Sequence, residues 1–283
     1  MSRQSDIVAD LEREAKAFRT PCGEGDLVWR RWGAGEPVVL CHGGSGSWTH
    51  WIKTIPVLAQ HCEVWAPDLP GLGDSAMPPR PWTPATSAEV LAAGLREIIS
   101  ADRPVHLVGF SFGAHVATLA AAQLNDRLAD LTIIGSAALG LPWRDLELPK
   151  ERSSMTVAER RGVHRRTLEI LMLADPAKID ELAIDLQMAN VARARFRSRE
   201  FAATDEIRTT LAHVTVPLKA IWGARDPRAR PNVEACFDVL RLHHPELVTR
   251  TIPDAGHWVM YEAADLFNAG LLELLGLSST STG

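Results

Sequence analysis

The sequence has few cysteines, no excess of positive charge and no long hydrophobic run. Its four cysteines stand far apart, without a C-x-x-C pair, which argues against a disulfide framework and against a zinc site. The formal net charge of −5 excludes the electrostatic footprint of a nucleic-acid-binding protein. No apolar stretch approaches the roughly 20 residues that a membrane span needs. We therefore expect a reduced, cytoplasmic setting, with no metal, no other cofactor, no nucleic acid and no membrane.

The N-terminal segment 1–19 is charged and amphipathic, and it lacks the apolar region of a secretory signal. This pattern favours a peripheral helix packed on the body of the protein. A lid or a contact in a homodimer is the alternative for this segment.

Short apolar segments alternate with amphipathic segments of helix length along most of the 283 residues. This alternation predicts an α/β fold, with a mainly parallel, twisted sheet and helices on both of its faces. The expected strands are a hairpin over 18–32, segments at 38–41, 63–66, 131–135, 218–222 and 248–252, and an apolar run from Val105 to Val108. Helices are expected at about 48–60 and 87–100.

The alternation fails between Ala137 and His213, where the sequence has helical periodicity and no convincing strand. An insertion of this size between two core strands predicts a helical cap over the carboxyl-terminal edge of the sheet. The predicted domains are a core formed by residues 1–136 and 214–283 and a cap formed by residues 137–213.

A Gly-x-Ser-x-Gly motif, with Ser111 at its centre, follows the apolar run from Val105 and precedes an Ala-rich helical segment. In that context the motif indicates a nucleophile elbow, in which a sharp strand-to-helix turn exposes the serine hydroxyl. The chain crowds itself at such a turn, so Gly109 and Gly113 supply the two positions that must lack a side chain. We therefore predict that Ser111 is a catalytic nucleophile.

A serine nucleophile needs a base, and the base needs a group that orients it. The chain order expected for this elbow is serine, acid, histidine. His257 follows the last predicted strand, and Asp226 follows the strand at 218–222, so these two are the predicted catalytic partners of Ser111. Asp254 is the second candidate for the acid.

The glycine-rich loop 42–47 is the predicted source of an oxyanion-hole amide, that of Gly44, and the amide of Phe112 is the second donor. Phosphate binding is the alternative for such a loop, but no Gly-Lys-Ser/Thr follows it. His42 is interpreted as a structural residue. Three aromatic residues near these segments are predicted to line a substrate pocket, with packing at the junction of core and cap as the alternative: Trp48, Trp143 and Trp258.

Together, these residues resemble the α/β-hydrolase superfamily over nearly the whole chain. The matching positions are His42-Gly43, Asp68-x-Pro70-Gly71-x-Gly73-x-Ser75, the elbow, Trp222-Gly223-x-x-Asp226 and Gly256-His257. The resemblance implies a buried pocket between core and cap, and it implies a structural role for the loop 68–75.

The tail from Asp254 to Glu262 is similar to that of the meta-cleavage-product C–C hydrolases, which cut vinylogous 1,5-diketones. Those enzymes usually carry an Asn beside the elbow, where Gly109 and Phe110 stand here. They also carry Ser-Met-Gly-Gly where this chain has Ser111-Phe112-Gly113-Ala114. The polar groups that handle a dienolate intermediate are therefore largely missing, which favours ester or lactone chemistry.

The sequence thus predicts a cofactor-independent serine hydrolase acting on a small carboxylic ester, lactone or related acyl compound. A C–C bond hydrolase and a cofactor-free perhydrolase share the same catalytic residues and remain alternatives. A non-catalytic ligand-binding protein on the same scaffold is the alternative from another class. Epoxide hydrolases and dehalogenases of this superfamily use an Asp nucleophile, so Ser111 disfavours them.

Overall fold

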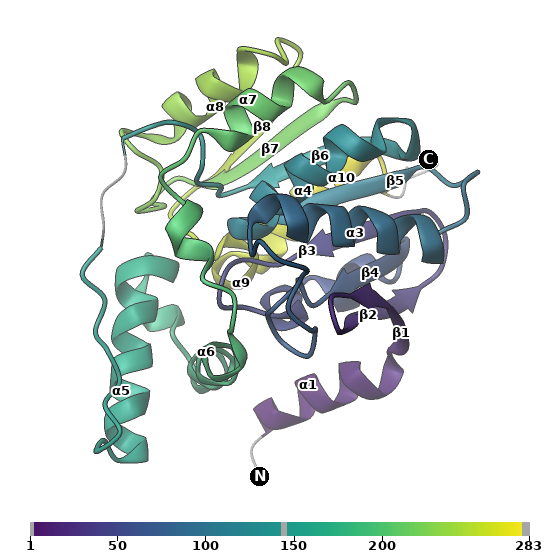
Figure 1. The fold of residues 1–283 in the computed structure, drawn as a ribbon. Helices are drawn as coiled ribbons and strands as arrows, with labels where there is room; N and C mark the ends of the chain where they lie inside the picture. The colour runs from purple at the N-terminus through teal and green to yellow at the C-terminus, as the bar shows by residue number, and fades with distance from the viewer. Residues whose placement is uncertain (1–2, 143–145, 279–283) are drawn as a thin grey trace, which may run out of the picture.

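A single eight-stranded sheet forms the centre of the computed structural model, which describes residues 3–142 and 146–278. In chain order the strands are β1 (Lys16–Cys22), β2 (Gly25–Gly33), β3 (Pro37–Cys41), β4 (Glu63–Pro67), β5 (Val105–Phe110), β6 (Leu128–Ile134), β7 (Leu218–Gly223) and β8 (Val248–Ile252). Their spatial order is β1-β2-β4-β3-β5-β6-β7-β8. The pairs β1/β2 and β2/β4 are antiparallel, and all other neighbours are parallel. Figure 1 shows helices in front of and behind this sheet, which confirms the predicted α/β fold.

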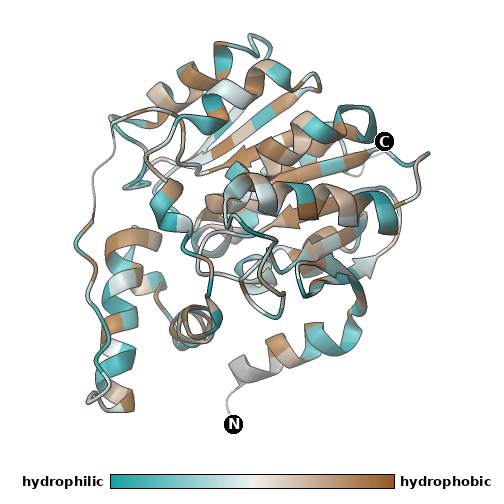
Figure 2. Ribbon diagram, viewed as in Figure 1, coloured by the Kyte–Doolittle hydropathy of each residue, from teal (hydrophilic) through white to brown (hydrophobic). Residues whose placement is uncertain are grey.

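The central strands β3, β4 and β5 are buried along their whole length. Successive side chains of a strand point to opposite faces, so both faces of the sheet are covered there. Val39 and Cys41 of β3 belong to the core on the face covered by α3 (Pro84–Ile98), α4 (Phe112–Leu124) and α8 (Val233–Arg241). Val38 and Leu40 belong to the core on the other face, which α2 (Ile55–Leu58) and α10 (Ala264–Leu275) cover. The apolar strands, brown in Figure 2, thus lie between two helical layers.

The predicted strands agree with the observed ones to within a few residues, and the opening hairpin is formed by β1 and β2. The prediction of one helix over 48–60 is wrong. A short 3-10 helix spans Trp48–Trp51, and α2 begins only at Ile55. Pro56 has no N–H to donate to the carbonyl of Ile52, so a continuous helix is interrupted there.

The N-terminal helix α1 (Arg3–Glu14) lies on the outside of the sheet, as the amphipathic pattern predicts. Leu11 is buried in the core, and its carbonyl accepts a hydrogen bond of 2.8 Å from the indole N–H of Trp32. α1 also contacts α6 (Glu181–Arg193), which belongs to the segment between β6 and β7.

That segment leaves the sheet after β6 and returns at β7. Besides α6 it contains α5 (Val157–Thr167) and α7 (Glu206–Thr210), and α5 continues into a π-helical turn over Leu168–Met172. Within the described residues of 137–213 no strand is present. Figure 1 shows α5 and α6 beside the body of the sheet, and Figure 2 shows mostly hydrophilic residues along α5. In the described parts of the chain, no helix has both the length and the apolar character that crossing a membrane requires.

Candidate active site

Ser111 stands alone between the end of β5 and the start of α4, with a backbone φ of 52° and ψ of −117°. Non-glycine residues rarely adopt a positive φ, so the turn is strained. A Cβ added to Gly109 would lie 2.5 Å from the Cα of Ala114, and one added to Gly113 would lie 2.3 Å from the carbonyl oxygen of Cys41. The two glycines of the motif are therefore required by the close approach of backbone to backbone.

His257 and Asp226 meet Ser111 at the carboxyl-terminal edge of the sheet. The Nε2 atom of His257 lies 3.0 Å from the Oγ atom of Ser111, and its Nδ1 atom lies 2.8 Å from Oδ2 of Asp226. The other carboxylate oxygen of Asp226 accepts a hydrogen bond of 2.8 Å from the backbone N–H of Arg228. His257 and Asp226 are buried, whereas the second acid candidate, Asp254, is exposed. The structure thus joins the three predicted residues in one hydrogen-bonded chain.

The loop after β3 lies directly against this turn. A Cβ added to Gly44 would lie 3.5 Å from the Cβ of Phe112, so the two backbone segments predicted to supply oxyanion donors are neighbours. His42 holds the loop in place, because its Nε2 atom accepts a hydrogen bond of 2.8 Å from the backbone N–H of Leu69. Burial lowers the pKa of His42, which keeps the ring neutral in this structural role.

A cavity of about 460 Å³ opens above Ser111. Its floor is formed by core residues, namely Gly43, Gly44, His50, Phe110, Phe112 and His257. Its opposite wall comes from the inserted segment, namely Leu148, Val163, Leu171, Met172 and Val191. His164 and Glu151 also line it and form a polar pair with a nitrogen–oxygen distance of 2.6 Å. His115 lines it too, and pairs at 2.6 Å with Glu206, which does not line the cavity. In the described part of the chain, no group of three or more His, Cys, Asp or Glu residues is placed to hold a metal ion.

The comparison with known families agrees with this geometry. A model described as "Alpha/beta hydrolase family" matches residues 38–269. The chain belongs to this family.

Several curated proteins are similar to this α/β-hydrolase over most of its length. The dihydrolipoyllysine-residue acetyltransferase component of the acetoin cleaving system of Pseudomonas putida is 28% identical over 85% of the chain, and the match spans 64% of that protein. The pimeloyl-[acyl-carrier protein] methyl ester esterase of Vibrio cholerae is 29% identical over 71% of the chain and 80% of the esterase. The 2-hydroxy-6-oxo-6-phenylhexa-2,4-dienoate hydrolase of Burkholderia cepacia is 24% identical over 86% of the chain and 88% of that hydrolase.

Among solved structures, that of a putative aryl esterase from Burkholderia cenocepacia has a TM-score of 0.73 at 24% identity, covering 92% of this chain and 98% of the esterase. This likeness shows the shared fold. The family match, together with the relatives named as an esterase and a hydrolase, identifies the chain as a hydrolase of the α/β fold.

The tryptophans predicted to line the pocket of this hydrolase lie elsewhere. Trp48 is buried beside the ring of Trp32, at a centroid distance of 5.4 Å, and it does not line the cavity. Trp258 is also buried: it stacks on Tyr261 at 4.2 Å, and its indole N–H donates a hydrogen bond of 2.9 Å to the carbonyl of His50. Both rings fill the core, because a large aromatic surface is stabilised more by close packing than by contact with a cavity. Trp143 lies outside the described residues.

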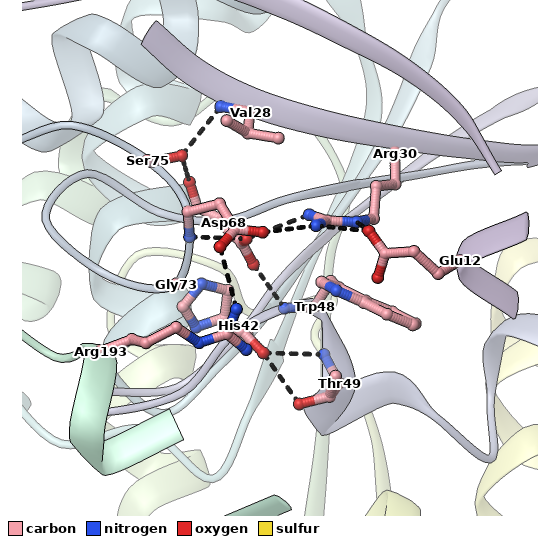
Figure 3. Close-up of polar contacts among 12 residues, drawn as sticks. Glu12, Val28, Arg30, His42, Trp48, Thr49, Asp68, Gly73, Ser75 and Arg193 are labelled. Atoms are coloured by element: carbon pink, nitrogen blue, oxygen red, sulfur yellow. Dashed lines mark hydrogen bonds and ion pairs between the residues drawn. The ribbon is translucent and has the colours of Figure 1, made fainter. Parts of the chain in front are cut away.

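The loop after β4 has the structural role that the family resemblance implies (Figure 3). The carboxylate of buried Asp68 accepts hydrogen bonds from the backbone N–H groups of Trp48 (2.9 Å) and Asp74 (3.0 Å) and from the guanidinium of Arg30 (3.1 Å). Asp74 also pairs with Arg193 of α6 at 2.9 Å. The network therefore joins the sheet, the loop that follows β3 and the inserted segment, and none of its charged residues lines the cavity above Ser111.

Sequence reasoning missed two residues beside the site. Glu262, at the end of α9 (Val259–Glu262), is buried, and its carboxylate accepts a hydrogen bond of 2.6 Å from the backbone N–H of Gly256, next to His257. His50 lines the cavity from the 3-10 helix that follows the glycine-rich loop. The available signal was a charged or titratable residue within an otherwise apolar segment.

Proposed function

We propose that this α/β-hydrolase cleaves a small carboxylic ester, lactone or related acyl compound through an acyl-enzyme formed on Ser111. The observation that carries this proposal is the hydrogen-bonded chain from Asp226 through His257 to Ser111 at the floor of the cavity. A hydroxyl in contact with an oriented imidazole is the arrangement that activates serine as a nucleophile.

In the acylation step, the Oγ atom of Ser111 attacks the carbonyl carbon while Nε2 of His257 accepts the hydroxyl proton. Asp226 accepts the Nδ1–H of the ring, which leaves Nε2 free as the acceptor, and it stabilises the imidazolium that forms. The tetrahedral intermediate expels the alcohol, which takes the proton from Nε2. In the second step a water molecule attacks the acyl-enzyme and loses a proton to the same nitrogen. Nε2 then returns that proton to Oγ of Ser111 as the acid is released.

The amides of Gly44 and Phe112 are proposed to stabilise the oxyanion of both tetrahedral intermediates. In the described part of the chain, neither amide is engaged in a turn or loop hydrogen bond. Phe112 is also the first residue of α4, so its N–H carries the partial positive charge of a helix N-terminus. Such preorganised donors stabilise developing negative charge more strongly in a closed site than in water.

Residues 137–213 are proposed to act as a cap that closes the substrate against the core. Side chains from both sides line one cavity, whose volume of about 460 Å³ lies within the usual range for small-molecule sites. The chemistry requires no cofactor, and the proposed partner is a small acyl compound.

Cleavage of a carbon–carbon bond is the second candidate, because one relative is named as a 2-hydroxy-6-oxo-6-phenylhexa-2,4-dienoate hydrolase. The apolar ring of Phe110 packs against His257 at a centroid distance of 5.0 Å, so an apolar side chain stands where a dienolate would need polar contacts. This observation favours ester or lactone cleavage.

A hydrolysis panel of aryl esters, lactones and vinylogous diketones, each measured with wild type and Ser111→Ala, tests the proposal. We expect turnover of esters or lactones by the wild type and none by Ser111→Ala. Faster turnover of the diketones would move the assignment to the second candidate. Turnover that persists in Ser111→Ala, or the absence of any turnover, would contradict the acyl-enzyme proposal.

A further inference from the structure

Besides His257, the cavity is lined by other imidazoles that the proposed chemistry at Ser111 does not use, and one of them is His50. Its side chain is only 3% exposed. The ring packs between Phe110, at a centroid distance of 5.6 Å, and Trp258, at 5.2 Å. An imidazole held this firmly between aromatic rings has a fixed orientation.

Two ring positions of His50 are already occupied. Its Nδ1 atom accepts a hydrogen bond of 3.2 Å from the backbone N–H of Gly43. Its Nδ1–Cε1 edge lies against Gly46, where an added Cβ would be 2.2 Å from Cε1 and 2.5 Å from Nδ1. Nε2, on the other side of Cε1 from Nδ1, is therefore the ring nitrogen left to face the cavity. In the described part of the chain, Nε2 has no hydrogen-bond partner.

The ring of His50 is neutral. Burial lowers its pKa well below the usual value, and the neighbouring imidazoles of His42 and His257 lower it further. A neutral imidazole carries one proton, and the nitrogen that accepts a hydrogen bond cannot carry it. Because Nδ1 accepts from Gly43, the proton is on Nε2.

His50 lines the same cavity as Ser111, and the backbone that it contacts lies against the nucleophile. Gly43, its hydrogen-bond partner, would place an added Cβ 3.3 Å from the Cβ of Ser111. A neighbouring cleft shares Ser45 and Ser198 with the cavity and leads outward along the inserted segment, and His50 does not line that cleft. An alcohol that leaves towards this cleft would leave the acyl part of the substrate on the side of His50.

We propose that His50 is a specificity-determining residue whose Nε2–H donates a hydrogen bond to an oxygen atom in the acyl part of the substrate. This inference rests on the proposed function of Ser111 as the acylated residue. It narrows the substrate class to acyl groups that carry an oxygen acceptor near the scissile carbonyl, such as alkoxy, hydroxy or keto acyl groups.

Pairs of p-nitrophenyl esters that differ by one atom test this. Methoxyacetate and 3-methoxypropionate replace one methylene of butyrate and valerate by an ether oxygen, with equal chain length. The ratio of kcat/KM within each pair is divided by the same ratio for alkaline hydrolysis, which removes the difference in intrinsic reactivity. We expect wild type to prefer the ether member of at least one pair by about tenfold, as one hydrogen bond provides.

The variant His50→Phe should reduce that preference to the alkaline ratio, whereas His50→Gln, which keeps both an acceptor and a donor, should restore it. A general loss from displacement of Gly43 would lower both members of a pair equally and leave the ratio unchanged. Equal ratios in wild type and His50→Phe would overturn the role of His50 while leaving the proposed function intact. If neither ester is hydrolysed and Ser111 is unreactive, the proposed function itself fails.

A spectroscopic measurement tests the protonation of His50 without turnover. Long-range ¹H–¹⁵N spectra of protein labelled with ¹⁵N-histidine, assigned with His50→Gln, should show a neutral ring with its proton on Nε2 at neutral and mildly acidic pH. An Nδ1–H tautomer, or titration with an ordinary histidine pKa, would overturn the inference.

Discussion

Replacement of Glu262 by glutamine should destabilise the active site, because this carboxylate joins the loop of His257 to the inserted segment. Glu262 is 7% exposed. Its Oε2 atom accepts hydrogen bonds from the backbone N–H groups of Gly256 (2.6 Å) and Ala174 (3.1 Å), and its Oε1 atom accepts one from Asp175 (2.7 Å). Three backbone N–H donors thus converge on the two oxygens of one carboxylate.

The expected magnitude follows from the geometry. A glutamine side chain has one acceptor oxygen. In its better orientation this oxygen keeps the hydrogen bonds from Gly256 and Ala174, and the NH₂ group then faces the N–H of Asp175. A hydrogen bond to a charged group contributes about 2 kcal/mol, and a buried donor left unpaired costs about 1 kcal/mol more. We therefore expect Glu262→Gln to lower the free energy of unfolding by about 3 kcal/mol.

Urea denaturation monitored by tryptophan fluorescence measures this change. The matched control is Glu234→Gln on α8, where the carboxylate is exposed and, among the described residues, forms an ion pair with Arg241 alone. A change below about 0.5 kcal/mol is expected there. Because Gly256 adjoins His257, kcat for an ester substrate should also fall in Glu262→Gln and stay unchanged in the control. Equal stabilities of the two variants would refute the bonding role assigned to Glu262.

Further predictions concern the elbow and a buried charge cluster. Gly113→Ala should lower the free energy of unfolding by about 3 kcal/mol or prevent folding, since its Cβ would lie 2.3 Å from a carbonyl oxygen of β3. The control Gly162→Ala on α5, where an added Cβ meets no atom within 4 Å, should be neutral or stabilising by up to about 1 kcal/mol. Thermal unfolding measures both changes. Burial lowers the pKa of His106, but hydrogen bonds to Asp130 and Glu36 raise it overall above 6.5. The protonated His106 ring therefore contributes its full stabilisation below pH 6.5, and this contribution is lost as the pH rises through the raised pKa. Urea midpoints measured up to about pH 9 should accordingly fall more for wild type than for His106→Gln.

The strands and the elbow could be predicted because local chemistry determines them. The apolar runs of β3 and β5 are buried on both faces, and Gly109 and Gly113 stand where backbone contacts exclude any side chain. The order Ser111, Asp226, His257 then gave the site, since parallel strands end at the same edge of the sheet.

The residues that were wrongly assigned, and those that were missed, depend on tertiary packing. Trp48 and Trp258 have the size and polarity of pocket residues, and only the packed structure shows that Trp32 and Tyr261 cover them. The role of Glu262 depends on donors almost 90 positions earlier in the chain, which no local pattern reveals.

The most direct test of the account is reaction with a fluorophosphonate, followed by intact-mass measurement and peptide mapping. The account predicts one adduct per chain on Ser111, absent in Ser111→Ala and formed much more slowly in His257→Ala, because the free hydroxyl is a weak nucleophile without its base. Absence of an adduct on the folded wild-type protein, or an adduct on another residue, would contradict the assignment of Ser111 as the nucleophile.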